Sequence, residues 1–407
     1  MVMRTKLLFG LVSASVIFTS CAQNSETKQA EVTLPAVETK DPNSKYPSAF
    51  EGQTRIAGVK SPFEVKATVL DTTLNKPWGI TSLPDGRFLI TEKEGTMRIA
   101  STDGKVGGTI TGLPKVSSEG QGGLLGVTID PDFATNRMVY FTFAEAVKGG
   151  NLTSVGKGRL SDDDSKIENA TVLYRAEPAF DGKLHFGGRI LFDKSGNLFV
   201  STGERSELAT RPKAQDLDAA LGKVVHITKD GKPVDGNPFA TQAGARPEIF
   251  TYGHRNVQSL AFHPETGDLW EAEFGPRGGD ELNRIEAGKN YGWPVITYGI
   301  EYKGDTIGTG IQQKEGMEQP VYYWDPSVSP SGMTFYSGSA IPEWKNNLFI
   351  GTLSGSHIVR LVIENNKVVG EERLLEDQKQ RFRDVTQGKD GNLYAVTDGG
   401  KLYKISK

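Results

Sequence analysis

A histidine and a glutamate stand at the two ends of one glycine-rich segment and could share a proton-transfer reaction. His185 lies in "KLHFGGRI", directly before a strand-like run that a Gly-Gly pair opens. Its imidazole has the side-chain pKa nearest neutrality and can accept a proton as a general base. Glu204, in "STGERS" at the end of the same run, could orient that imidazole and stabilise its protonated form. A satisfied surface or core role is the alternative for any of the five histidines.

Three arginines indicate an anionic ligand. Arg255 and Asn256 precede one strand-like segment in "YGHRNVQSLAF", and Arg381 and Arg383 precede another in "QRFRDV". Alternate residues of a strand point the same way, so Arg381 and Arg383 share a face. Guanidinium groups match carboxylates, and a cofactor with several carboxylates would satisfy all three arginines. Ion pairs with acids elsewhere in the chain are the alternative.

Gly275 and Pro276 form a corner that could present oxygen ligands to a metal. Pro276 fixes its own φ and has no N–H to compete, so consecutive carbonyls can be exposed. Asp280 and Glu281 follow within one loop, in "FGPRGGDELN". Calcium takes carboxylate and carbonyl oxygens, whereas zinc would require a Cys/His cluster that the sequence does not contain. A turn with two solvated acids is the alternative.

A strand–turn–strand pattern that occurs six times must position these residues. The copies begin at Gly79, Gly126, Gly188, Leu260, Gly332 and Arg383, for example "GRILFDKSGNLFVSTGE". Each copy alternates apolar and polar residues with period two, as a β-hairpin does. Six hairpins, each extended to about four strands, can pack radially, so the sequence predicts an all-β, six-bladed β-propeller of four-stranded antiparallel blades over residues 56–407. A pair of β-sandwiches is the alternative, and either fold excludes a nucleotide cyclase, whose similar Gly-Gly-Asp-Glu run needs an α/β palm.

The first 55 residues have a different composition. A positively charged start and an apolar run at 7–18 precede Cys21. This order predicts a lipoprotein-type signal peptide over 1–21 and a lipid anchor on Cys21, at the periplasmic side or surface of a bacterial cell envelope; an ordinary cleaved signal is the alternative. The polar residues 22–55 predict a flexible tether. The net charge of −3 gives no general attraction for nucleic acid.

As an ordered set, these segments resemble the soluble quinoprotein sugar dehydrogenases, the glucose/sorbosone dehydrogenase family, from about Thr68 to Lys404. Further segments that carry the resemblance are "EGQGGLLGVTIDPDF", "NYGWP" and "SPSGMTFY". The family uses pyrroloquinoline quinone (PQQ) and calcium on a six-bladed propeller. The resemblance is closest to the broad aldose dehydrogenases. It implies oxidation of an aldose at the C1 hydroxyl to a lactone, with electrons passing to an unidentified acceptor, a quinone or a cytochrome.

The resemblance also implies roles for single residues. His185 would take the C1 hydroxyl proton while hydride passes to the quinone, with Arg255 beside the quinone oxygens. Cofactor contacts are implied for Gln121, Arg255, Asn256, Ser327, Arg381, Arg383 and Asp398. The carbonyls of Gly275 and Pro276 would hold the calcium that bridges to PQQ, and a second, structural calcium is implied around Asp280, Glu281 and Tyr291.

Two positions depart from the family pattern. Leu184 stands where relatives usually carry Asp or Asn before the base, and Ser354 stands where they often carry a lysine on the cofactor. Loss of a cation from a carboxylate-binding site weakens binding. An alternative is therefore a non-catalytic lipoprotein propeller that binds a carbohydrate or a partner protein. A calcium-dependent propeller hydrolase of the lactonase type has less support, because the sequence does not offer an obvious side-chain metal set at the axis.

Overall fold

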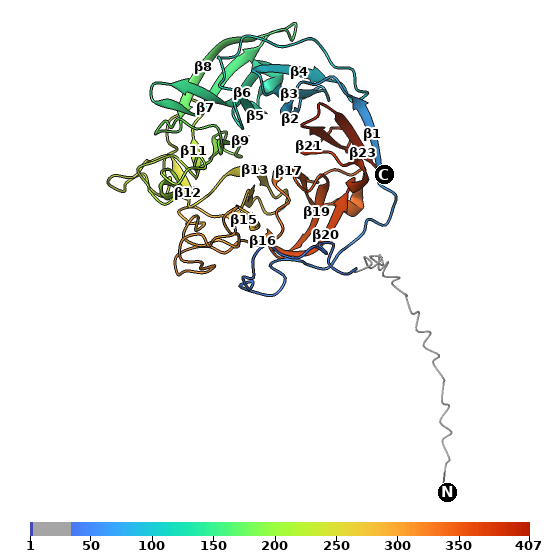
Figure 1. Ribbon diagram of the computed structural model, residues 1–407. Coiled ribbons are helices and arrows are strands. Elements are labelled where there is room, and N and C mark those ends of the chain that lie inside the picture. The colour runs from blue at the N-terminus through green and yellow to red at the C-terminus, as the bar shows by residue number, and fades with distance from the viewer. Residues whose placement is uncertain (3–33) are drawn as a thin grey trace. The chain divides into compact units, whose positions relative to one another are not determined.

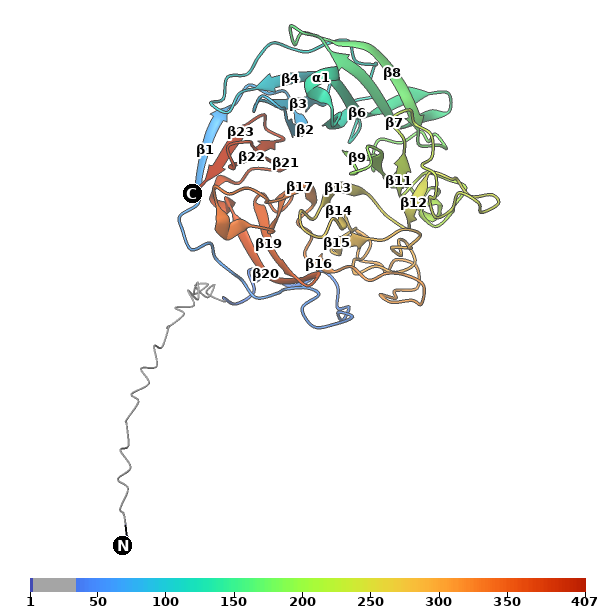
Figure 2. The same ribbon diagram turned by 180° about the vertical axis from the view of Figure 1, so that it is seen from behind.

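Six antiparallel sheets surround a central axis in the computed structural model, which describes residues 1–2 and 34–407 (Figures 1 and 2). The predicted six-bladed β-propeller is confirmed. The fold is nearly all β: helical structure in the described part of the chain is limited to α1 (Phe133–Asn136) and the 3₁₀ turns η1 (Arg211–Ala214), η2 (Pro342–Trp344) and η3 (Glu376–Gln378).

We number the blades along the chain and order the strands of each blade from the axis outward. Blade 1 contains β2 (Pro77–Ser82), β3 (Phe88–Glu92) and β4 (Thr96–Ala100). Blade 2 contains β5 (Leu124–Ile129), β6 (Met138–Val147), β7 (Gly150–Leu160) and β8 (Ile167–Arg175). Blade 3 contains β9 (Gly187–Phe192), β10 (Leu198–Thr202), β11 (Lys223–Ile227) and β12 (Ile249–Tyr252).

The second half of the ring continues in the same order. Blade 4 contains β13 (Val257–Phe262), β14 (Leu269–Glu273), β15 (Asp280–Ile285) and β16 (Tyr322–Trp324). Blade 5 contains β17 (Pro330–Phe335), β18 (Leu348–Thr352), β19 (Ile358–Glu364) and β20 (Lys367–Leu374). Blade 6 contains β21 (Phe382–Gln387), β22 (Leu393–Thr397), β23 (Leu402–Ser406) and β1 (Lys66–Asp71).

The six repeated hairpins are the two innermost strands of each blade, β2–β3, β5–β6, β9–β10, β13–β14, β17–β18 and β21–β22. Their first strands contact one another in a ring around the axis. Blade 1 differs from the expected four strands, because its outer edge is formed by isolated bridges, Met97 with Ile110 and Ala100 with Val106. The segment 101–112 thus replaces a regular fourth strand.

The ring is closed by strands from both ends of the propeller. In blade 6, β1 pairs antiparallel with β23 in a register that places Lys66 opposite Ser406. Apolar side chains then fill the spaces between blades: Phe88 of blade 1 packs against Tyr394 of blade 6, with ring centroids 4.3 Å apart. Each blade therefore buries the face that a lone hairpin would expose.

Buried hydroxyl groups link neighbouring blades near the axis. Thr142 of β6 accepts a hydrogen bond from the amide of Gly126 in its own blade at 2.9 Å and donates to the carbonyl of Gly188 in blade 3 at 2.5 Å. Thr91 of β3 makes the same pair of contacts, to Gly79 and to Leu125 of blade 2. The register between the two innermost strands shifts at these positions, in β2–β3 and in β5–β6. The threonine hydroxyls therefore bond backbone groups that have no partner in the regular strand pairing.

Replacing Thr142 with valine is expected to destabilise the propeller. The valine would fill similar space but leave a buried amide and a buried carbonyl without their partner, at a cost of about 1–3 kcal/mol for each unsatisfied group. Denaturant unfolding measures the loss. Thr111→Val at an exposed site is the control, and equal stability of the two variants would contradict the proposed link.

The segment before the propeller departs from the prediction of a flexible tether through residue 55. Residues 34–61, which we call the strap, follow the outer edges of blades 4 and 5 (Figures 1 and 2). Leu34 bridges Gly58, Gly58 pairs with Glu371 of β20, and Glu38 forms an ion pair with Arg373 at 2.7 Å. The prediction is therefore wrong for residues 34–55, because their polar groups find partners on the propeller.

The predicted anchor lies in a part of the chain that the structure does not describe. Cys21, the signal segment and the first part of the tether fall within residues 3–33. Among the described residues, no helix has the length and apolar character needed to cross a membrane.

Candidate active site

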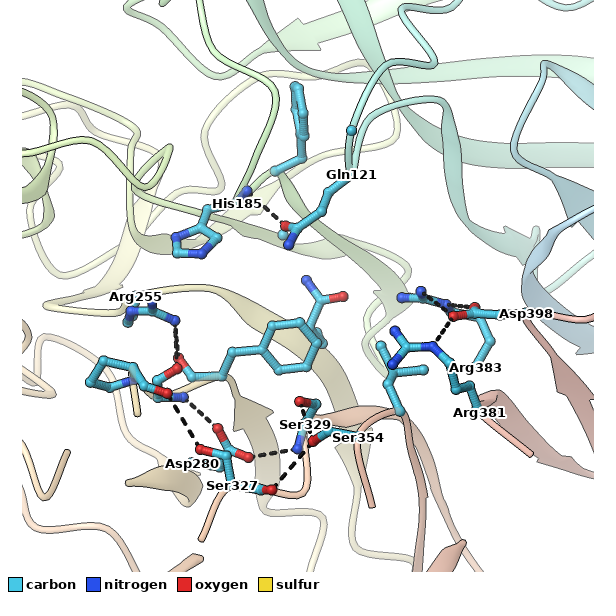
Figure 3. Close-up of a pocket in the computed structure, with 18 of the residues that line it drawn as sticks. Gln121, His185, Arg255, Asp280, Ser327, Ser329, Ser354, Arg381, Arg383 and Asp398 are labelled. Carbon is cyan, nitrogen blue, oxygen red and sulfur yellow. Dashed lines mark hydrogen bonds and ion pairs between the residues drawn. The ribbon is translucent and has the colours of Figure 1, made fainter. Parts of the chain in front are cut away.

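A cavity of about 770 Å³ opens at the end of the axis where each innermost strand begins and the second strand of each hairpin ends. Antiparallel pairing brings these two ends together in every blade. Residues just before the first strand or just after the second therefore converge from different blades. The volume lies within the range of about 300–1,000 Å³ typical of small-molecule sites. Figure 3 shows the labelled polar side chains around this space.

His185 is held with one ring nitrogen against Glu204. Its Nδ1 lies 2.6 Å from Oε1 of Glu204, which also accepts the amide N–H of Ser206 at 3.0 Å. Both side chains are almost fully buried. In the described part of the chain, Nε2 has no hydrogen-bond partner, and His185 lines the cavity. When Nδ1–H donates this hydrogen bond to the carboxylate, Nε2 carries no proton. Nε2 is then a hydrogen-bond acceptor, the state that a general base needs.

The backbone of His185 is fixed by neighbouring blades. Its φ of +46° lies in the left-handed region, which residues other than glycine seldom adopt. The side-chain oxygen of Gln121 accepts its amide N–H at 2.9 Å. Arg205 donates to the carbonyls of Leu184 and Gly182 and lies over the ring of Phe186 at 3.9 Å. Leu184, one of the two departures, is partly exposed at 40% and only its carbonyl enters this network.

The pKa of His185 falls to about 4 in this setting. Burial disfavours the imidazolium most, and the positive charge of Arg255 adds to that effect, while Glu204 opposes both. The imidazole is therefore neutral and able to accept a proton at neutral pH.

Arg255 occupies the corner that the sequence singled out as a metal site. Its guanidinium donates to the carbonyl of Gly275 at 2.6 Å and to that of Phe274 at 3.1 Å, and it lies over the Trp293 ring. Its buried Nε has no partner. A positive group thus already contacts the Gly275 carbonyl at the cavity wall. Asn256 lies behind Arg255, where its side-chain oxygen accepts the amide of Gly187 at 3.0 Å, so it braces the turn after His185.

Asp280 holds the Gly275–Gly279 loop rather than facing solvent. Its two carboxylate oxygens accept the amides of Gly275 at 2.8 Å and Ser329 at 2.6 Å. Burial raises the pKa of Asp280 to about 6, against these two hydrogen bonds. Ser327 accepts the Gly278 amide at 3.0 Å and lies 3.4 Å from the Pro276 carbonyl. The corner is therefore tied to the segment that leads into β17.

Cations gather on the opposite wall. Arg381 and Arg383 share a face, as predicted, and both donate to Asp398, with Nε–oxygen distances of 2.8 and 2.7 Å (Figure 3). Burial of Asp398 works against ionisation, but the two arginines hold its pKa below the usual range. Lys93 lines the same cavity; burial and the nearby Lys76 lower its pKa. Among the described residues, this side of the cavity lining thus carries Asp398 against four cations, Lys76, Lys93, Arg381 and Arg383, of which Lys76 is also paired with Glu94. The excess of positive charge favours an anionic ligand.

A cluster of acidic residues and one histidine lies beside the cavity. His254, Glu271 and Glu273 are buried, with ligand atoms within 4.8 Å of one another. Glu281 is next to them: burial and the charge of Glu273 raise its pKa. One carboxylate oxygen of Glu271 and the side-chain oxygen of Asn283 are buried without a partner.

Tyr291 lies against this cluster rather than beside Asp280. Its ring stacks on His254 with centroids 4.8 Å apart, while its hydroxyl donates to the Arg284 carbonyl and accepts the Glu286 amide. Asp280 and Glu281, although adjacent, point to opposite faces of β15. The structure therefore places Asp280 apart from Glu281 and Tyr291, the three residues that the resemblance grouped around one calcium.

Most of the predicted residues do meet at one cavity. Its lining includes Gln121, His185, Arg255, Gly275, Pro276, Asp280, Ser327, Ser354, Arg381, Arg383 and Asp398. Glu204 and Asn256 support this wall from behind, and Glu281 and Tyr291 belong to the acidic cluster. Sequence reasoning missed Lys93, although it directly follows the second strand of the first hairpin, as Asp398 follows that of the last. Ser354, the second departure, bonds through its hydroxyl to Ser329.

Comparisons with known proteins agree with this architecture. The family model for glucose/sorbosone dehydrogenase matches residues 74–404. The chain is 43% identical to aldose sugar dehydrogenase YliI of Escherichia coli, an alignment that covers 85% of this chain and 94% of that protein. It is 46% identical to a solved glucose dehydrogenase, with a TM-score of 0.81 over 84% of this chain and 99% of the other. A PQQ-bound aldose sugar dehydrogenase from Streptomyces coelicolor is 28% identical, with a TM-score of 0.69 over 85% and 99%.

The chain belongs to the glucose/sorbosone dehydrogenase family. The predicted family and enzyme class, an oxidoreductase, are thereby confirmed. The match begins at residue 74, so the strap lies outside it.

Proposed function

We propose that this protein is a PQQ- and calcium-dependent dehydrogenase that oxidises aldoses at the C1 hydroxyl to lactones. The observation that carries the proposal is the neutral His185, whose free Nε2 faces a cavity walled by Arg255, Arg381, Arg383 and Lys93. A base and a cationic cavity are what removal of a hydroxyl proton beside a polycarboxylate cofactor requires. The names of the relatives give the substrate class, and the PQQ-bound neighbour gives the cofactor.

The residues present fit such a cofactor. The buried Nε of Arg255 has no protein partner, and Arg381 and Arg383 share a single carboxylate. The three guanidinium groups can therefore bind further carboxylates without losing an existing ion pair. Trp78 and Phe186 supply apolar wall around them, as a flat ring system needs. Ser354 offers a hydroxyl instead of a cation at the edge, so the arginines and Lys93 must carry more of the binding.

Calcium suits the oxygen atoms of two places. The carbonyls of Gly275 and Pro276 line the cavity, and the contact of Gly275 with a guanidinium shows that its oxygen accepts a positive partner. The cluster of His254, Glu271 and Glu273, with Glu281 next to it, suits the structural ion in place of Asp280, because one oxygen of Glu271 and the side-chain oxygen of Asn283 are buried without a partner.

The chain's own part in the reaction is proton removal. Bound PQQ would supply the acceptor for the hydride that leaves C1 of the sugar. His185 Nε2 accepts the C1 hydroxyl proton, and the resulting imidazolium is stabilised by Glu204 through Nδ1. Gln121 and Arg205 keep the histidine loop in place. An external acceptor, a quinone or a cytochrome, would have to take the two electrons before a second turnover.

Calorimetric titration tests the proposal directly. The purified protein should bind PQQ at micromolar concentration with calcium present and lose that binding when a chelator is added. Addition of an aldose to the loaded protein should then change the cofactor's absorbance. Absence of PQQ binding with calcium present would reject the dehydrogenase function and favour the non-catalytic carbohydrate- or partner-binding propeller.

We also propose a lipid anchor on Cys21 in the bacterial envelope, because this cysteine follows a short apolar run. Cys21→Ala should move the protein from the membrane fraction to the soluble fraction on cell fractionation. Ser20→Ala, which keeps the cysteine, is the matched control and should remain with membranes. Retention of the Cys21→Ala variant in membranes would point to another anchor.

A further inference from the structure

The strap reaches the wall of the candidate active site. Asn43 lines the cavity, and its side-chain oxygen accepts a hydrogen bond from Nε of Arg277 at 3.0 Å. Arg277 belongs to the same Gly275–Gly279 loop that presents the carbonyl corner. A segment outside the family match therefore contacts the part of the site that would hold the cofactor's metal.

Asp325 lies between the strap and that loop. Its carboxylate accepts four hydrogen bonds from the strap, from the amides and side chains of Asn43 and Ser44, at 2.8–3.0 Å. Asp325 is buried, and Gly278 passes so close above it that an added Cβ would lie 2.6 Å from the carboxylate. With φ of +79°, Gly278 is also in a conformation that favours glycine. The Gly278 backbone therefore packs closely against the carboxylate that the strap holds.

The strap is itself held in shape at this point. Arg55 donates to the carbonyls of Glu38 and Lys40 within the strap and to the carbonyl of Asp325 on the propeller, at 3.2, 2.7 and 2.7 Å. The other side of the loop is tied down independently, with the Gly279 amide on the Trp324 carbonyl and the Gly278 amide on Ser327. The loop is thus clamped between the propeller and the strap.

We propose that the strap is a positioning element of the active site, which fixes the Gly275–Gly279 loop through Asp325 and Arg277 and so strengthens cofactor binding. The proposal rests on the proposed function for its second half, because binding of PQQ is what the ordered corner would favour. Its first half concerns only the apoprotein. Asn43 and Ser44 act through the loop and need not touch the reacting atoms.

Hydrogen–deuterium exchange of the apoprotein separates the two halves. The amides of Arg277, Gly278 and Gly279 are hydrogen-bonded and report on loop order. Deletion of residues 34–48 should raise their exchange rates about tenfold or more, while the amide of His185 exchanges as before. Asn43→Ala with Ser44→Ala, which leaves the chain intact, should produce a smaller change in the same direction, and it decides the matter if the deletion variant does not fold. Lys45→Ala, at an exposed strap position, should have no effect.

PQQ titration with saturating calcium completes the experiment. The deletion should weaken PQQ binding about tenfold, with unchanged exchange in the rest of the propeller. Unaltered loop exchange in both variants overturns the proposal, and so does faster exchange with unchanged PQQ affinity. If the wild-type protein itself binds no PQQ, the proposed function fails, and the exchange rates alone then decide whether the strap orders the loop.

Discussion

Replacing His185 with glutamine or alanine is expected to lower aldose turnover by about a hundred- to ten-thousandfold, the range that a positioned general base contributes. Neither side chain has a basic nitrogen at the position of His185 Nε2 that could take the C1 hydroxyl proton as the hydride leaves. Steady-state kinetics of the PQQ- and calcium-loaded protein measures the loss in kcat. PQQ affinity should change little, because the cationic wall and the carbonyl corner are untouched.

His226→Gln is the matched control for this result. His226 is likewise hydrogen-bonded to a carboxylate, that of Asp193, at 2.9 Å, but it lies on β11 outside the cavity lining. Turnover of the folded control should stay near that of the wild type. Near-normal turnover in the His185 variants would mean that another group removes the proton, and the assignment of the base would fail.

Replacing Glu204 with glutamine is expected to shift the pH profile toward acid and to reduce turnover by roughly ten- to a hundredfold, a smaller loss than the about hundred- to ten-thousandfold expected for removal of the base itself. Burial and Arg255 lower the pKa of His185 to about 4, and the charge of Glu204 is what opposes them. Without that charge the pKa falls further, so the histidine stays neutral to lower pH but becomes a poorer proton acceptor. Measurement of kcat from pH 3 to pH 8 tests both changes.

Glu207→Gln provides the comparison at an exposed carboxylate three residues away. Its profile should coincide with that of the wild type. If the fall of kcat at low pH occurs at the same pH in Glu204→Gln as in the wild type, this acid limb of the profile does not report the protonation of His185. A merely structural effect of Glu204 would lower kcat at all pH values without moving the limb.

The fold was predictable because the repeated hairpins are its innermost strands. Period-two alternation and turn residues recur there with little variation, since every blade must present the same two strands to the axis. The outer strands follow no shared pattern, because each packs against different loops. The closing strand at Lys66–Asp71 could not be identified from repetition, since its partner lies more than three hundred residues away at the other end of the chain.

The candidate site was predictable where residues flank a hairpin and not where contacts are made across blades. His185, Arg381 and Asp398 stand at hairpin ends, and the structure brings them to one cavity. Asp280 and Glu281 lie on opposite faces of β15, because adjacent strand residues face opposite ways, and their proximity in the sequence did not indicate this. Asn43 gave no signal, since its partners Arg277 and Asp325 are far along the chain and polar composition alone suggested disorder.

The pairing of β1 with β23 has a consequence for biosynthesis. Strand β23 (Leu402–Ser406) is synthesised more than three hundred residues after its partner β1. Blade 6, which carries the arginine wall at Arg381 and Arg383, can therefore be completed only after β23 has been made. A chain truncated before β23 would lack the strand that joins β1 to β22, so it would be left as an open arc and a substrate for proteolysis.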